Sequence, residues 1–116
     1  MAADVIIYHN PKCAKSRETL QLLRDHGVEP QVVKYLEDPP SPQRVLDFID
    51  MLGLEPAQIV RSREKEYKKV GLSAQSSRDE VAHAIAAYPV LLERPIVVRG
   101  GKARLGRPPE RVLEIL

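Results

Sequence analysis

The sequence contains a single cysteine, Cys13, in its 116 residues. A disulfide within the chain is therefore impossible, so redox chemistry at this thiol would need a second thiol from another molecule. The three histidines, His9, His26 and His83, are scattered along the chain. Together with one cysteine they give none of the ligand spacings of zinc or iron–sulfur sites. We expect no metal and no bound cofactor.

Tryptophan is absent, and four tyrosines and one phenylalanine are the only aromatic residues. The hydrophobic content of 43% then predicts one domain, residues 1–116, with a modest aliphatic core. No apolar run approaches the length of a membrane span, and residues 1–4 do not resemble a signal peptide. The net charge of +2 arises from 18 basic and 16 acidic residues mixed along the chain. We expect a cytoplasmic monomer that binds neither nucleic acid nor membrane.

Residues 5–26 (VIIYHNPKCAKSRETLQLLRDH) organise the rest of the chain. The short apolar run VIIY predicts a buried strand, and the polar, helix-forming segment after Pro11 predicts a helix that Gly27 closes. Cys13 then lies at or just before the first turn of this helix. Free backbone N–H groups and the positive end of the helix dipole gather there, and both favour a thiolate.

The neighbours of Cys13 support a reactive thiol, because Lys12, Lys15 and Arg17 add positive charge. The alternative is that Cys13 is a small buried hydrophobic residue, as most free cysteines are. His9 lies four residues earlier and could orient the thiol or help to ionise it. A single histidine in a loop is, however, more often only solvated.

The next segments predict a second strand and a well-defined helix. Residues 31–36 (QVVKYL) are rich in β-branched residues, and the order strand, helix, strand favours a parallel pair with a right-handed crossover. Ser41 is the expected cap of a helix that starts at Pro42 and ends at Gly53. The apolar face of this helix consists of Val45, Leu46, Ile49 and Leu52.

Shorter helices are expected at residues 56–60 and 64–70, and a further one after Ser77, which forms a capping box with Glu80. The apolar residues of that last helix are Val81, Ala84, Ile85 and Tyr88. Residues 42–88 therefore form a helical insertion.

The C-terminal stretch returns to strand periodicity at Ile96–Val98, turns at Gly100–Gly101 and continues as an edge strand at Lys102–Leu105. Pro108–Pro109 opens a last helix, for which Val112, Leu113 and Leu116 supply the apolar side chains. The order β-α-β, helical insertion, β-β-α is that of an α/β protein with a thioredoxin-like fold.

Three arginines adjoin structural breaks: Arg61 follows Ile59-Val60, Arg94 precedes Pro95, and Arg107 precedes Pro108-Pro109. Each could be an ordinary surface arginine. If they converged on Cys13, they would hold a tetrahedral oxyanion by charge-assisted hydrogen bonds. A phosphatase-type loop is excluded, since it needs an arginine six positions after the cysteine, where this chain has Thr19.

Four separated blocks resemble the ArsC-type arsenate reductases of the glutaredoxin-coupled class, above all the shorter chromosomal members. The blocks are YHNPKCAKSRETL, IVRSREKEYKKVGL, ERPIVV and RLGRPPERVLEIL. The resemblance implies that Cys13 attacks arsenate, that His9 and Ser16 support the thiolate, and that three arginines hold the oxyanion. These arginines are Arg61, Arg94 and Arg107.

The same resemblance implies glutathione as co-substrate and glutaredoxin as partner. Glutathione would attack the Cys13–arsenate adduct, and glutaredoxin would reduce the mixed disulfide to release arsenite. A cis Arg94–Pro95 bond is expected beside the cysteine, as in thioredoxin-like folds.

Two other functions are considered on the same fold. A glutathione-linked thiol-transfer protein would need Cys13 but not the arginines. An Spx-like regulator that binds RNA polymerase usually carries a CxxC switch, which Ser16 rules out here.

Overall fold

The computed structural model describes residues 4–116 and divides them into two compact units. The first unit contains the N-terminal part through Asp38 together with Arg94–Leu116, and the second contains Pro39–Glu93. The predicted helical insertion at residues 42–88 falls inside the second unit. That residues 1–116 form one domain stays a prediction.

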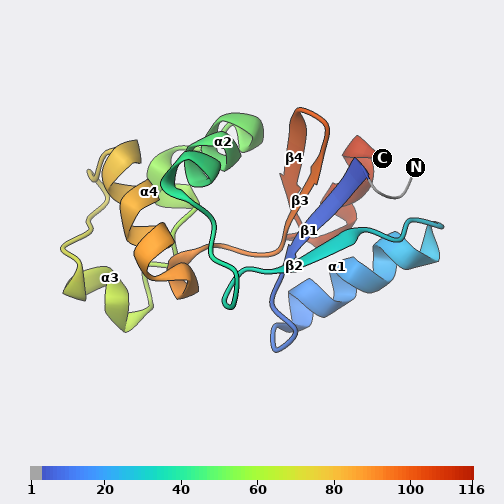
Figure 1. The fold of residues 1–116 in the computed structure, drawn as a ribbon, viewed down its shortest axis with the longest axis horizontal. Helices are drawn as coiled ribbons and strands as arrows, with labels where there is room; N and C mark the ends of the chain where they lie inside the picture. Colours follow the sequence, from blue (N-terminus) through green and yellow to red (C-terminus); the bar gives the residue numbers. More distant parts are fainter. Residues whose placement is uncertain (1–3) are drawn as a thin grey trace. The chain divides into compact units, whose positions relative to one another are not determined.

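The first unit is built on a four-stranded sheet with the order β2-β1-β3-β4 (Figure 1). Its strands are β1 (Val5–His9), β2 (Gln31–Lys34), β3 (Ile96–Arg99) and β4 (Lys102–Leu105). As predicted, β1 and β2 are parallel, and β3 and β4 form an antiparallel hairpin with β4 at the edge. β3 also runs antiparallel to β1. The end of β1, the start of β3 and the end of β4 consequently lie together at the same end of the sheet.

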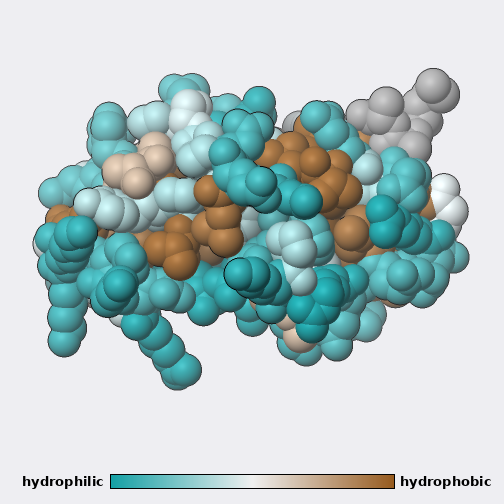
Figure 2. Space-filling view, turned by 60° about the horizontal axis from the view of Figure 1, so that its bottom comes forward, coloured by the Kyte–Doolittle hydropathy of each residue, from teal (hydrophilic) through white to brown (hydrophobic). Residues whose placement is uncertain are grey.

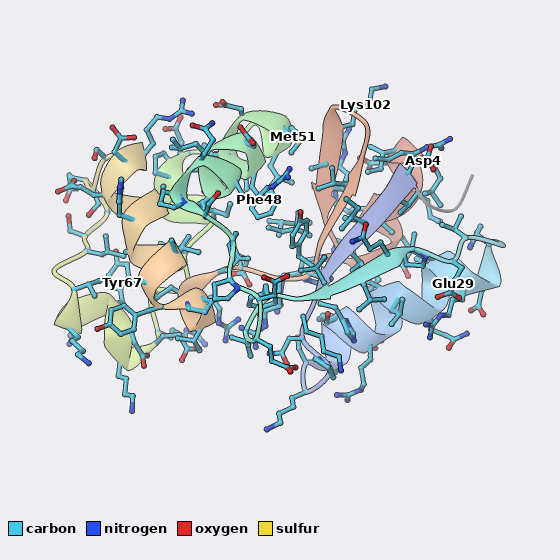
Figure 3. All side chains as sticks on the ribbon, in the orientation of Figure 1. Asp4, Glu29, Phe48, Met51, Tyr67 and Lys102 are labelled. Carbon is cyan, nitrogen blue, oxygen red and sulfur yellow. The ribbon has the colours of Figure 1, made fainter. Side chains whose placement is uncertain are left out.

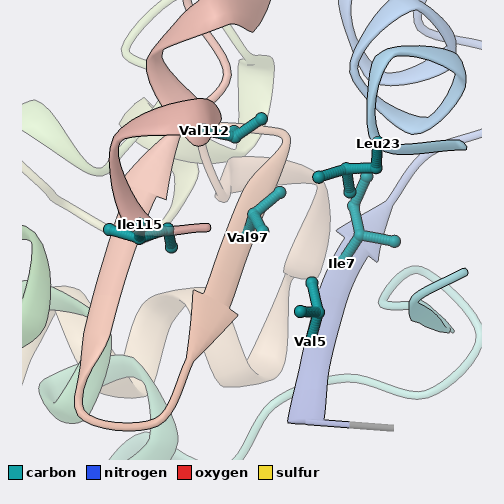
Figure 4. Packing of buried hydrophobic residues seen from close by; sticks show 6 residues of the cluster. All are labelled: Val5, Ile7, Leu23, Val97, Val112 and Ile115. Carbon is teal, nitrogen blue, oxygen red and sulfur yellow. The ribbon is translucent and has the colours of Figure 1, made fainter. Parts of the chain in front are cut away.

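The core of this unit lies between the sheet and two helices, α1 (Ala14–Asp25) and η4 (Pro109–Ile115). Figure 4 shows the aliphatic side chains that meet there, one or more from each of these elements. They are Val5, Ile7, Leu23, Val97, Val112 and Ile115. Truncation of buried aliphatic residues of this kind costs about 2–5 kcal/mol, so these contacts hold α1 firmly against the sheet. The position of Cys13 is therefore determined by a packed helix.

The second unit is helical, as the sequence predicted. It contains α2 (Pro42–Leu52), η2 (Pro56–Gln58), α3 (Lys65–Lys69), α4 (Arg78–Ala87) and η3 (Pro89–Leu91). The Ser41 hydroxyl accepts from the Arg44 amide, and Ser77 and Glu80 form the expected capping box. α2 packs on α4.

Some boundaries and packing residues differ from the predictions. The second strand ends at Lys34 rather than at residue 36, because the chain turns there: the amides of Glu37 and Asp38 both bond to the Lys34 carbonyl. The helix predicted at residues 56–60 is only a three-residue 3₁₀ turn, because Val60 pairs with Leu92 in a β-bridge instead.

The apolar face of α2 also includes the fully buried Phe48, which the prediction omitted (Figure 3). Tyr88, predicted among the apolar residues of α4, is instead its C-cap residue and follows the last helical residue. The last helix is a 3₁₀ helix, consistent with its short length and its two leading prolines. Ile115 packs into the core in place of Leu116, which is 37% exposed.

The surface carries few large hydrophobic side chains: among residues 4–116, Leu36 and Leu116 are the exposed ones. The face in Figure 2 is mostly hydrophilic, with its hydrophobic residues in separate patches. Within the same residues, no helix combines the length and hydrophobicity needed to cross a bilayer.

Candidate active site

Cys13 is the N-cap residue of α1, in agreement with the prediction. Its backbone is extended, its amide donates to the Asn10 carbonyl (3.0 Å), and its carbonyl accepts from the Arg17 amide (3.0 Å). The loop from β1 and the first turn of α1 thus hold the residue from both sides. Cys13 is 9% exposed, so the residue is largely buried at this junction.

Arg94 and Arg107 reach Cys13 because of the strand order. Tyr8, Ile96 and Leu105 lie side by side on β1, β3 and β4, so the residues just beyond these positions lie at the same end of the sheet. The Arg107 guanidinium donates to Cys13 Sγ at 3.9 Å, and the Arg94 side chain also hydrogen-bonds the thiol. Two of the three predicted arginines are therefore beside the sulfur.

The two arginine segments are also bonded to each other. Arg107 Nε donates to the Arg94 carbonyl at 2.7 Å. The Arg94–Pro95 peptide bond is cis, which confirms that prediction, and the Arg107–Pro108 bond is cis as well. Pro95 itself is buried just before β3.

These surroundings lower the pKa of Cys13. Burial raises it, but the Ser16 amide, the hydrogen bond and charge of Arg94, and the Lys15 amide together lower it by more. All of the lowering groups are positive or partially positive and stabilise the thiolate. These surroundings therefore favour the thiolate of Cys13 more than those of an ordinary buried cysteine would.

The rate of Cys13 alkylation by iodoacetamide is expected to reach half its plateau at a pH below about 8.5, the value for a free thiol. Only the thiolate reacts, so the rate follows the ionised fraction and rises with pH. The measurement reports on one site, because the chain has no other cysteine. A midpoint at or above that of a model thiol would contradict an activated nucleophile.

His9, at the end of β1, and Ser16, in the first turn of α1, form a buried pair on either side of the loop that holds Cys13. His9 Nδ1 lies 2.6 Å from Ser16 Oγ, and Ser16 Oγ also accepts from the Asn10 amide at 3.0 Å. Burial lowers the pKa of His9, and nearby cations, Lys34, Arg24 and Arg17, lower it further. A ring that is neutral at pH 7 contributes no positive charge to the thiolate, so the contacts favour orientation of the first turn as its role. That His9 and Ser16 assist the chemistry stays a prediction.

Arg61 belongs to the second unit, and its guanidinium pairs with two carboxylates of that unit. Its guanidinium pairs with Glu64 (3.1 Å) and Glu93 (3.4 Å), and its amide donates to the Leu91 carbonyl at 2.7 Å. An oxyanion would have to compete with these two carboxylates for the guanidinium. Its place in an oxyanion site stays a prediction.

Sequence reasoning missed Thr19 and Gly106, both buried beside this site. The Gly106 amide donates to the Pro95 carbonyl at 2.9 Å, and Thr19 Oγ1 donates to the Lys15 carbonyl at 2.8 Å. A glycine between an edge strand and an arginine was the available signal, since it indicates a close approach of the backbone. In residues 4–116 no three histidine, cysteine or acidic side chains are grouped to hold a metal ion.

A cysteine at the N-cap of the helix after β1, with the order β-α-β, helical insertion, β-β-α, defines the class: a thioredoxin-like fold with a single thiol at the start of its first helix. The model of the ArsC family matches residues 8–115 of the chain. This protein belongs to the ArsC family.

Individual relatives cover essentially the whole chain. "Arsenate reductase" of Haemophilus influenzae is 45% identical over 115 residues, which are 97% of this chain and 99% of that protein. "Uncharacterized protein YfgD" of Escherichia coli K12 is 50% identical over 118 residues, 100% of this chain and 99% of that protein. The solved structure "Arsenate reductase from Vibrio cholerae" superimposes with a TM-score of 0.93 at 52% identity and covers 100% of both chains.

Proposed function

We propose that this protein is an arsenate reductase, an oxidoreductase that uses thiols as its source of electrons. The observation that carries the proposal is the approach of two guanidinium groups, from Arg94 and Arg107, to the sulfur of the buried Cys13. Relatives that bear this name at 43–45% identity over 97% of the chain support it. A general thiol-transfer site would need the thiolate but not two arginines beside it.

In the first step the Cys13 thiolate attacks arsenic, a sulfur–arsenic bond forms, and one arsenate oxygen leaves as water after protonation. Arg94 and Arg107 hold the remaining oxygens and offset the negative charge that builds up on them. Arg107 is well placed for this, because its guanidinium contacts the sulfur while the residue is exposed to incoming anions. Arg61 is the third predicted contributor.

In the second step glutathione attacks Cys13 Sγ, and a disulfide forms between the two sulfurs. The electron pair of the sulfur–arsenic bond stays on arsenic, which is reduced from As(V) to As(III). Arsenite therefore leaves in this step, before glutaredoxin reduces the mixed disulfide, and not at the later step that the family resemblance implied. Glutaredoxin then attacks the glutathione sulfur of the mixed disulfide and releases the Cys13 thiolate. The external thiols are required because Cys13 has no second cysteine in the chain to pair with.

The proposed setting follows from this chemistry. Glutathione and glutaredoxin act in reducing compartments, so a cytoplasmic location is proposed, with the protein acting as a monomer. No bound cofactor takes part. The Spx-like alternative stays less well supported, since Ser16 occupies the position where a CxxC switch would need its second cysteine.

Purified protein with glutathione, glutaredoxin and a nicotinamide-linked recycling system is expected to consume reducing equivalents in proportion to the arsenate added. Omission of either thiol partner should stop turnover, because each is needed to regenerate Cys13. Phosphate should compete without being reduced, since it shares the shape and charge of arsenate. If arsenate causes no consumption while Cys13 still forms a mixed disulfide with glutathione, the thiol-transfer function is supported and the arsenate reductase is not.

A further inference from the structure

Gly106 lies where the chain leaves β4 and passes closely against α1 and Pro95. A Cβ atom built at this position would lie 2.8 Å from Pro95 Cγ and 3.1 Å from Thr19 Cγ2, and closer still to Thr19 Oγ1. Non-bonded carbon atoms in proteins do not approach to 2.8 Å, so a side chain at this position would displace either residue 106 or its neighbours Thr19 and Pro95. The other glycines have nothing within 4 Å of such an atom.

The groups on the α1 side are poorly able to move. Thr19 is fully buried, and its hydroxyl is bonded to the Lys15 carbonyl one turn earlier. α1 in turn packs against η4 and the sheet (Figure 4). The segment that holds Gly106, in contrast, follows an edge strand that pairs only with β3. A clash would therefore displace the 106–107 segment rather than the helix.

Two hydrogen bonds depend on the position of this segment. The Gly106 amide donates to the Pro95 carbonyl at 2.9 Å, and Arg107 Nε donates to the Arg94 carbonyl at 2.7 Å. The second bond leaves the far end of the Arg107 guanidinium directed at Cys13 Sγ, 3.9 Å away. The contact between arginine and thiol is thus set by how closely residue 106 approaches Thr19 and Pro95.

We infer that Gly106 is a positioning residue of the thiol site: the absence of a side chain lets the chain pass between Thr19 and Pro95 and brings the Arg107 guanidinium to the Cys13 sulfur. The residue touches neither the sulfur nor a substrate and acts only through Arg107. The inference deepens the proposed function, because it concerns the same anion site. It does not need arsenate for its test, so the two can fail separately.

Gly106→Ala is expected to raise the midpoint pH of Cys13 alkylation by a few tenths of a unit, because the Arg107 guanidinium 3.9 Å from the sulfur stabilises the thiolate and its displacement weakens that contact. Gly101→Ala is the matched control. Gly101 lies in the β3–β4 turn, its φ is outside the left-handed region, and an added methyl group would contact nothing within 4 Å. This variant should alkylate with the wild-type midpoint.

Two further comparisons separate positioning from a general loss of structure. In an Arg107→Ala background, Gly106→Ala should leave the alkylation midpoint where Arg107→Ala alone places it, since no guanidinium remains to be displaced. In the double variant that carries Gly106→Ala and Thr19→Ala, the alkylation midpoint should return partway toward that of Thr19→Ala alone. The second substitution removes two of the three atoms that lie closest to the added methyl group at position 106. The double variant also supplies a folded protein if Gly106→Ala alone does not fold.

The inference is overturned if folded Gly106→Ala protein keeps the wild-type midpoint. It is equally overturned if the substitution shifts the midpoint by the same amount with and without Arg107, because the effect would then not pass through that residue. Thermal unfolding of each variant establishes that it is folded at the temperature of the assay. A positive result with no arsenate turnover would support the positioning role and contradict the proposed function.

Discussion

Cys13→Ser is expected to abolish arsenate-dependent consumption of reducing equivalents, to the background of the assay. The serine hydroxyl is not ionised at neutral pH, so the first bond to arsenic would not form. Even a bound arsenate ester could not proceed, because oxygen does not form the mixed disulfide through which glutathione delivers its electrons. The coupled assay with glutathione and glutaredoxin measures this loss directly.

The matched measurement for this variant is anion binding. The arginines beside position 13 do not depend on the sulfur for their backbone contacts, since Arg107 Nε remains bonded to the Arg94 carbonyl. Cys13→Ser should therefore still bind arsenate or phosphate in calorimetry. Turnover above background in the serine variant would show that Cys13 is not the nucleophile and would withdraw the proposed mechanism.

Much of the site could be predicted from the sequence because its determinants are local. The apolar run before Pro11 and the polar segment after it define a strand–helix junction, and Cys13 lies at its centre. The capping residues Ser41 and Ser77 likewise act within one helical turn, and both helices start where predicted. Local hydrogen-bonding and backbone preferences carried these predictions.

The parts that local sequence patterns do not determine depend on pairing between distant segments. Arg94 and Arg107 were expected at Cys13 only from the family resemblance. Arg94 and Arg107 meet at Cys13 only because β3 and β4 lie antiparallel beside β1 in a given register, which no local pattern specifies. The packing of Gly106 against Thr19 joins residues 87 positions apart, from 19 to 106, for the same reason. Phe48 was missed on α2 because the predicted apolar face of this helix omitted one residue at its border.

The second large effect concerns the arginines: Arg107→Ala is expected to lower kcat/KM for arsenate by about 10²-fold, the usual loss on removing one oxyanion donor. Arg107 contacts Cys13 Sγ and would also hold the arsenate oxygens, so both attack and binding weaken. Arg94→Ala should cost at least as much, since its side chain also stabilises the thiolate. Steady-state kinetics with arsenate as the varied substrate give both values.

The control for charge is Arg111→Ala, which removes a cation that lies on η4 and is paired only loosely with Glu114 at 3.7 Å. It should keep wild-type kcat/KM within about twofold, because an exposed ion pair contributes little. Arg107→Lys should recover part of the activity, since it restores the charge but not the planar, bidentate donors that suit an oxyanion. If Arg107→Ala and Arg111→Ala reduced the rate equally, Arg107 would act only through the net charge of the protein, and the oxyanion site would have to be sought elsewhere.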